Sequence, residues 1–351
     1  MALDVMRGIT VFFMIIVNNG WEVSYEQLRH SDWNGLTCCD LVFPFFLFIM
    51  GVTTYLSLSK TNFAISWPTV GKILKRTVLI LLICWALHWF DNVCDGKGWL
   101  DFQHLRLTGV LTRIALCYGI VSLMALFLPR KAMIAAAVVL LIVYGWLLLS
   151  FNGYANDLSN INTVVDRKLL PEGLLYTKRP VDPEGLLATI SAVAHTIIGF
   201  CCGHIIKKKT PLDSRLLSLF VVATFLIAGG LALSGVMPIN KRVWSPSYVL
   251  VSCGIASAML AALSWLIDLK GWRKAFIFFE SFGVNPLFLY VLAEALIPLL
   301  DRFGVTARWY GLIGAHIADP YLASAVYSVS LSLFLGLIGL YLYRRRIYIK
   351  I

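Results

Sequence analysis

The chain has 351 residues, of which 59% are hydrophobic and 14% are charged. A soluble globular domain is nearer to about half apolar and about a quarter charged, so this composition excludes an ordinary soluble enzyme. The net charge of +11 could indicate a nucleic-acid partner, but no basic stripe lies on a polar, foldable segment. Lys and Arg collect in the cytoplasmic loops of membrane proteins, which accounts for the charge without nucleic acid.

Long apolar runs that are poor in charge predict an all-α bundle of membrane-spanning helices. Asp4 and Arg7 interrupt the first run, but no small-residue cleavage site follows it, as a signal peptide would require. We therefore interpret it as the first span of a single integral-membrane domain over 1–351. The ten predicted spans are 4–20, 38–59, 73–90, 108–128, 132–150, 186–205, 216–234, 247–268, 276–300 and 321–343.

The distribution of charge predicts how this bundle is oriented. With the N-terminus inside, the short inner segments carry eighteen of the thirty Lys and Arg residues, including Lys207–Lys209 and Arg344–Arg346. Positive charge in short loops marks the cytoplasmic side, so we expect both termini in the cytoplasm. The outer loops are rich in Trp, Tyr, Asn, Asp and Gly, and we interpret the longest, 151–185, as a small lid.

Cysteine and histidine spacing predicts neither a disulfide framework nor a metal site. Only Cys94 of the eight cysteines lies in an outer loop, and the chain has no C-x-x-C pair. Cys202 and His204 lack partners at the spacing that zinc requires. We therefore expect no metal.

Three polar residues near the outer end of the first two spans are candidates for chemistry. Asn18 ends the first span, His30 lies in the following loop, and Asp40 lies inside the start of the second span. A carboxylate within a span costs about 2.5–3.5 kcal/mol on insertion scales and usually faces a wet cavity or the protein interior. Asp40 could instead cap its helix or pair with an arginine, and a lone loop histidine is often only solvated.

Other polar residues stand at the outer ends of later spans. Arg106 and Arg113 are seven residues apart, so on one helix they would share a face and require anions such as lipid phosphate, Asp40 or substrate. Asp182 and Glu184 precede the sixth span, where they could cap its N-terminus or bind a ligand.

One further motif precedes the eighth span, and another interrupts the ninth. Lys241 and Trp244 lie just before the eighth span. Asn285 and Pro286 lie inside the ninth, where proline breaks the hydrogen-bond ladder and frees backbone groups. Glu294 follows on the same helix.

Together these segments resemble the transmembrane acyltransferases of the heparan-α-glucosaminide N-acetyltransferase type. The most specific part is the block from His30-Ser31-Asp32-Trp33-Asn34-Gly35 to Asp40-Leu41-Val42-Phe43-Pro44. The resemblance covers nearly the whole chain in order. It also includes Leu3-Asp4-Val5-Met6-Arg7-Gly8, Arg106-Leu107-Thr108-Gly109, Asp182-Pro183-Glu184-Gly185, Lys241-Arg242-Val243-Trp244-Ser245 and Asn285-Pro286.

The resemblance implies an enzyme that moves acetyl from cytosolic acetyl-CoA to the amine of an amino sugar or glycan, such as the glucosamine of heparan sulfate, on the other side of the membrane. It implies that His30 is the catalytic histidine, as base or acyl carrier, with Asn18 beside it. Asp40 would orient His30 or hold the acceptor. The expected substrate contacts are Trp33, Asn34, Arg106, Arg113, Glu184, Lys241, Trp244 and Asn285, and the expected donor-binding cations are Lys72, Lys75 and Arg76.

Two functions other than catalysis are alternatives for a chain with these intramembrane polar residues. Such residues also mark translocation paths, so an amino-sugar or glycan transporter is the alternative. A non-catalytic scaffold would leave them unexplained. We expect the protein in a bacterial inner membrane, surrounded by lipid and with the periplasm on its outer side; the sequence leaves a homodimer open.

Overall fold

The computed structural model describes residues 1–349, which form thirteen α-helices, short 3-10 and π segments, and no strand. The predicted all-α class is therefore confirmed. The helices are α1 (Ala2–Asn18), α2 (Cys38–Leu58), α3 (Trp67–Cys94), α4 (Val110–Phe127), α5 (Arg130–Ser150), α6 (Ile161–Leu169), α7 (Thr189–Lys207), α8 (Leu212–Ser234), α9 (Pro246–Ser264), α10 (Ile277–Val284), α11 (Pro286–Arg302), α12 (Val305–Gly314) and α13 (Pro320–Arg344).

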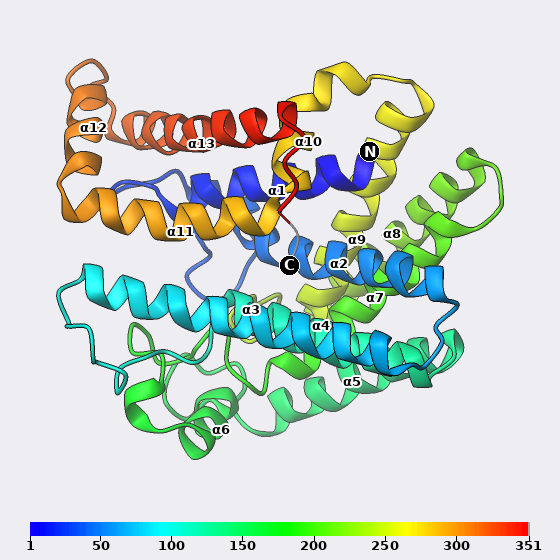
Figure 1. The fold of residues 1–351 in the computed structure, drawn as a ribbon. Coiled ribbons are helices and arrows are strands. Elements are labelled where there is room, and N and C mark those ends of the chain that lie inside the picture. Colours follow the sequence, from blue (N-terminus) through cyan, green and yellow to red (C-terminus); the bar gives the residue numbers. More distant parts are fainter. Residues whose placement is uncertain (350–351) are drawn as a thin grey trace.

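The long helices lie side by side, with their connections at two opposite ends (Figure 1). The short connections α2–α3, α4–α5 and α7–α8 lie at the right end of the view. The long connections, together with α6 and α12, lie at the left. This division matches the short inner and long outer loops expected from the sequence. Within residues 1–349, seven helices are long and apolar enough to cross a membrane, or eight if the bent pair α10–α11 forms one span.

The expected number of ten spans would require α1 and α3 to cross as well. The first of them, α1, has only 17 residues and carries Asp4 and Arg7. Arg7 bonds the Asp4 carboxylate at 3.1 Å and the Gly283 carbonyl of α10 at 2.9 Å, so both charges are satisfied inside the protein. Helices α1 and α10 approach closely at glycines: a Cβ on Gly8 of α1 would overlap the carbonyl oxygen of Phe279 in α10. This packing makes α1 an interior element of the bundle.

The predicted break in the ninth span is present. The arms Arg273–Val284 and Pro286–Arg302 meet at an angle of 70°. At the bend, the Asn285 amide donates to the Ile347 carbonyl at 2.9 Å and accepts from the Ile349 amide at 2.8 Å. The C-terminal tail therefore satisfies the polar groups that the broken helix exposes.

Burial separates interior helices from those at the rim. In α7, 67% of the apolar window is buried inside the protein, against 28% in α5 and 22% in α8. The last two therefore present most of their apolar side chains outward, as lipid-facing helices do. The core around α2 contains Phe48, Ile197 and Tyr248, which are all fully buried.

We predict that Gly8→Val destabilises the protein by roughly 3 kcal/mol or more, because overpacking at a backbone contact forces α1 and α10 apart. Thermal unfolding of detergent-purified protein measures the effect. Gly229→Val, in α8, is the matched control because a Cβ there meets nothing within 4 Å. Equal loss of stability in the two variants would contradict the close α1–α10 packing.

Candidate active site around His30

The site begins where the first long loop enters α2. Thr37 caps the helix through a capping box: its hydroxyl accepts from the Asp40 amide, and the Asp40 carboxylate accepts from the Thr37 amide at 3.1 Å. The Ser31 amide and the Thr37 hydroxyl also donate to this carboxylate. The other carboxylate oxygen of Asp40 lies 2.9 Å from Nδ1 of His30. Asp40 thus both starts the helix and positions the histidine.

This pair has the geometry of an oriented base. The Asp40 side chain is fully buried, whereas 46% of the His30 side chain is exposed. An ionised carboxylate can only accept a hydrogen bond, so Nδ1 of His30 carries the hydrogen in this contact. Nε2 is then the nitrogen left to accept a proton or to attack an acyl carbon.

Lys241 is the third member of the cluster. It is buried, and its ammonium lies 2.9 Å from Nδ1 and 3.1 Å from Nε2 of His30, and 3.8 Å from the Asp40 carboxylate. Burial lowers the pKa of Lys241, against the opposing effect of Asp40. The Asp40 carboxylate and the Lys241 ammonium therefore balance each other's charge beside the imidazole. Cys39, whose sulfur lies 3.1 Å from Nδ1, is a neighbour that the sequence did not indicate.

Three loops meet over this group. The Asn240 amide donates to the Asn34 side chain at 3.0 Å, and the Trp33 indole donates to the Tyr154 carbonyl at 2.9 Å. Arg242 donates to the Ser31 carbonyl at 3.2 Å. The predicted sugar contacts Trp33 and Asn34 therefore lie in the wall around His30. Asn34 is exposed there, and Trp33 is half-buried.

Trp244 lies beneath the site and not on its surface. It is fully buried at a positive φ of 52°, a conformation that a bulky residue adopts only when its surroundings enforce it. Its ring packs edge-on against Phe43 and Tyr248, and the Arg113 guanidinium lies 5.0 Å from the ring centre. The Tyr248 hydroxyl donates to the Asp40 carbonyl at 2.6 Å, so this aromatic group supports the start of α2.

The two predicted arginines have protein partners. The fourth helix begins at Val110, so Arg106 lies before it and does not share a helical face with Arg113. Arg106 bonds Asp182 at 2.6 Å and Glu184 at 2.8 Å. Arg113 donates to the backbone carbonyls of the same segment. The anions near these arginines are therefore Asp182 and Glu184. These acids do not cap the sixth predicted span, α7, which has no side-chain cap.

Neighbouring positive charges keep Glu184, in the cluster around Arg106, ionised. Burial alone would raise the pKa of Glu184, but the charges of Arg106, Arg113 and Lys241 lower it below its usual value. The lowered pKa keeps Glu184 ionised at neutral pH. Glu184 therefore links the Arg106 cluster electrostatically to Lys241 beside His30.

The segment 151–185 is fixed by buried polar side chains. Asn160 donates to the carbonyls of Gly153 and Ala155, and Thr163 donates to the Pro180 carbonyl. In α6, Asp166 accepts from the Leu186 amide at 2.9 Å. Its other oxygen is buried without a partner among residues 1–349. The role of this segment as a lid stays a prediction.

Asp166 gives this segment a pH dependence. Burial raises its pKa from 3.8 to about 6. Because the folded state favours the protonated acid, the contribution of Asp166 to the free energy of unfolding is fully present below pH 3.8 and is lost as the pH rises through 6. We predict that the thermal stability of Asp166→Asn exceeds that of the wild type by roughly 2–3 kcal/mol at pH 7 and by much less at pH 4.

Thermal unfolding at pH 4 to 8 tests this expectation. The amide keeps the acceptor for Leu186 but has no charge to bury. Asp157→Asn, in an exposed acid of the same segment, is the control and should follow the wild type. A constant difference between Asp166→Asn and wild type across this range would show that ionisation of Asp166 does not matter.

Some of the predicted site residues lie apart from His30. Asn18 is exposed at the end of α1 and donates to Glu294 at 3.4 Å; no hydrogen bond within the described chain joins it to His30. Asn285 binds the C-terminal tail. Lys72 and Lys75 are exposed on α3.

Arg76 is also exposed, and it lines a large cavity of about 730 Å³ that is open to the outside. The cavity extends from Lys60, just beyond the end of α2, to Phe46 within that helix, a rise of about 21 Å. Phe46 lies about 9 Å along the helix from Asp40. The size and place of this space could not be predicted from the sequence, because its walls come from six separate helices, α1, α2, α3, α4, α10 and α11. Its lining also includes Arg7, Ile49, Met50, Ile80, Leu111, Ile114, Tyr118, Leu287 and Tyr290.

Comparison with known proteins identifies relatives over most of the chain. A family model described as "Heparan-alpha-glucosaminide N-acetyltransferase, catalytic" matches residues 1–181, which include His30, Asp40, Arg106 and Arg113. The heparan-alpha-glucosaminide N-acetyltransferases of mouse and human are each 28% identical to this chain, over 84% and 83% of its length. The chain spans about half the length of these curated relatives, 53% and 52%.

Proposed function

This chain belongs to the heparan-α-glucosaminide N-acetyltransferase catalytic family, and we propose that it transfers acetyl from acetyl-CoA, bound from the cytoplasm, to an amino-sugar or glycan acceptor on the opposite side of the membrane. The observation that carries this proposal is a half-exposed histidine, oriented by a buried carboxylate at the start of α2, the helix along which a cavity with basic residues extends. The acceptor is proposed as a class, since the relatives' names give heparan glucosamine for those proteins only.

His30 would carry the central proton transfer. An amine attacks a thioester only after losing a proton, and histidine titrates nearest to neutral pH. In direct transfer, Nε2 takes the proton of the amine, the new N–C bond forms, the C–S bond breaks, and the proton passes to the leaving thiolate. In a two-step route, Nε2 attacks the thioester, the C–S bond breaks and the thiolate leaves; the amine then attacks the acetyl carbon, the bond from that carbon to Nε2 breaks, and the proton of the amine passes to the released Nε2. In both routes, Asp40 holds Nδ1–H and so keeps Nε2 available.

The large cavity suits the acyl donor. Its walls are mainly apolar, and Lys60, Arg76 and Arg7 lie toward one end. Arg76 stacks on Tyr118, with its guanidinium 4.7 Å from the ring centre. The phosphates of the donor would contact this basic end, together with Lys72 and Lys75 on the exposed face of α3, and the thioester would point toward Phe46 and His30.

The proposed placement has ten spans with both termini in the cytoplasm, in a bacterial inner membrane. The buried α1 and the long α3 supply the two spans beyond the eight that hydropathy supports. The ends of the helices that carry Lys60, Arg130 and Lys207 then lie inside, where positive charge collects. His30 lies at the periplasmic end.

A transporter for the same acceptor class is the second candidate. The bent pair α10–α11 lines the large cavity with Val284, Pro286 and Leu287. Broken helices at such a cavity are typical of substrate sites in transporters. Uptake of a radiolabelled amino sugar into proteoliposomes without acetyl-CoA would favour this function, whereas acetylation without net uptake favours transfer.

We predict that His30→Ala lowers acetyl transfer to an amino-sugar acceptor by roughly 10²–10⁴-fold, because it removes the base or acyl carrier. Binding of acetyl-CoA, measured by calorimetry on the same preparations, should change little. His104→Ala is the matched control, since His104 is also exposed and paired with a carboxylate, Asp101, at 2.7 Å. Full activity of His30→Ala would contradict the proposed mechanism.

We predict that Arg76→Gln weakens acetyl-CoA binding by about tenfold, because a charge contact with phosphate is lost. Calorimetry with acetyl-CoA and with the dephosphorylated donor arm, acetyl-pantetheine, separates the two ends of the ligand. Only acetyl-CoA should bind less tightly to the variant. Arg273→Gln, in an exposed arginine outside the cavity, is the control. Equal weakening by both substitutions would remove the cavity from the proposal.

A further inference from the structure

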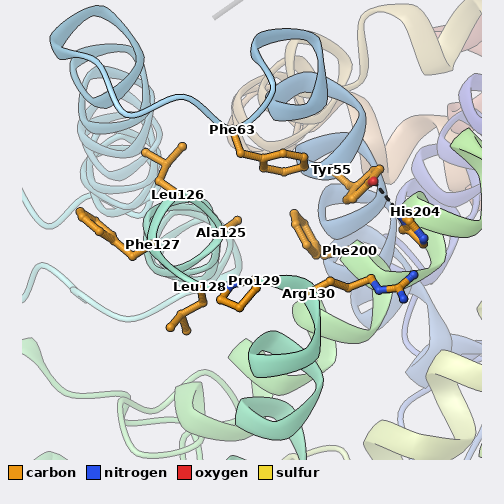
Figure 2. Close-up of a pocket in the computed structure, with 10 residues that line it drawn as sticks. All are labelled: Tyr55, Phe63, Ala125, Leu126, Phe127, Leu128, Pro129, Arg130, Phe200 and His204. Carbon is orange, nitrogen blue, oxygen red and sulfur yellow. Dashed lines mark hydrogen bonds between the residues drawn. The ribbon is translucent and has the colours of Figure 1, made fainter.

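A second cavity, of about 370 Å³, lies at the ends of α2, α4 and α7 that bear the dense positive charge. Figure 2 shows it between the aromatic rings of Phe63, Tyr55 and Phe200 on one side and the turn from α4 to α5 on the other. It shares no lining residue with the large cavity along α2. The acyltransfer proposed above therefore does not account for it.

One wall of this cavity is polar and cationic. The Tyr55 hydroxyl and Nδ1 of His204 lie 2.7 Å apart, and Arg130 extends toward His204 (Figure 2). None of the lining residues is acidic, and no ion pair within residues 1–349 involves Arg130 or His204. Lys207–Lys209 follow α7 directly, and the connections 59–66, 128–129 and 208–211 contain no Asp or Glu. The site thus has cationic charge that the protein does not balance.

The remaining walls are apolar and continue onto the outside of the bundle. Phe127 is 66% exposed and Leu128 37% exposed at the rim of the cavity. They adjoin α5, whose Val138 and Ile142 also lie outward. A ligand that occupies the cavity can therefore extend along a lipid-facing helix.

We propose that this cavity binds an anionic phospholipid of the cytoplasmic leaflet. The phosphate contacts Arg130 and His204, and an acyl chain lies along the aromatic wall and α5. A soluble anion would complement only the charge of Arg130, and a neutral lipid would complement only the apolar walls. An anionic amphiphile matches both, at the level where a cytoplasmic leaflet meets water in the proposed orientation.

Native mass spectrometry of detergent-purified protein tests the proposal, with phosphatidylglycerol and phosphatidylcholine of identical acyl chains as probes. Wild type should bind one phosphatidylglycerol about fivefold more tightly than phosphatidylcholine, the factor expected for about one basic residue at a membrane surface. Arg130→Gln should abolish this preference. Lys131→Gln removes the neighbouring exposed cation, which does not line the cavity, and should retain the preference.

Phe63→Ser tests the apolar wall independently and should weaken binding of both lipids. Equal affinity of wild type for the two lipids, or an unchanged preference in Arg130→Gln, would overturn the proposal. Displacement of bound phosphatidylglycerol by millimolar inorganic phosphate would show a simple anion site. Displacement by acetyl-CoA in wild type would assign the cavity to the donor's nucleotide.

Discussion

The buried carboxylate of Asp40 is the interaction on which the rest of the site depends. A charge without solvent is stable only when each of its oxygens has hydrogen-bond donors. Asp40 obtains them from Ser31, Thr37 and His30, with the Lys241 ammonium nearby. Each of these donors comes from a loop that must close over the start of α2. Folding of the outer loops and orientation of His30 are therefore the same event.

The supports of this carboxylate extend well into the bundle. Tyr248 of α9 holds the Asp40 backbone, Trp244 packs against Tyr248, and Arg113 of α4 lies over the Trp244 ring. Arg113 is in turn held by the carbonyls of Pro183 and Gly185, just before α7. The helices around the site thus meet through charged and aromatic groups and not through apolar packing alone. Such contacts fix positions more narrowly than apolar packing, since each has few good geometries.

The structure pairs His30 with Asp40 and with Lys241, whereas the sequence predicts Lys241 only as a substrate contact and Asn18 as the third catalytic residue. Asn18, His30 and Asp40 attract attention because they lie at or between the ends of strongly apolar runs. A polar residue at such a position is conspicuous against its neighbours, and its depth in the membrane follows from the run itself. The partners of Arg106 could not be predicted in the same way. The choice among lipid, substrate and Asp182 depends on how the segment 151–185 folds, and hydropathy carries no information on that. The start of α4 was placed two residues early for a similar reason, since Thr108 is buried by bonding Asp182 and not by entering the helix.

The cavity along α2 was not predictable from any single segment, yet its cause is local. Proline after Asn285 turns α11 away from α10 by 70°, while Arg7 and Gly8 hold α1 tightly against α10. Space consequently opens between α11 and the helices α2, α3 and α4, beside the close α1–α10 contact, from which Asp4, Arg7 and Val284 also line it. In the proposed reaction this space admits the donor from within, and the loops around His30 admit the acceptor from outside. The two substrates then meet at one half-exposed imidazole, so acetyl can cross without a pathway that carries either substrate through the bundle.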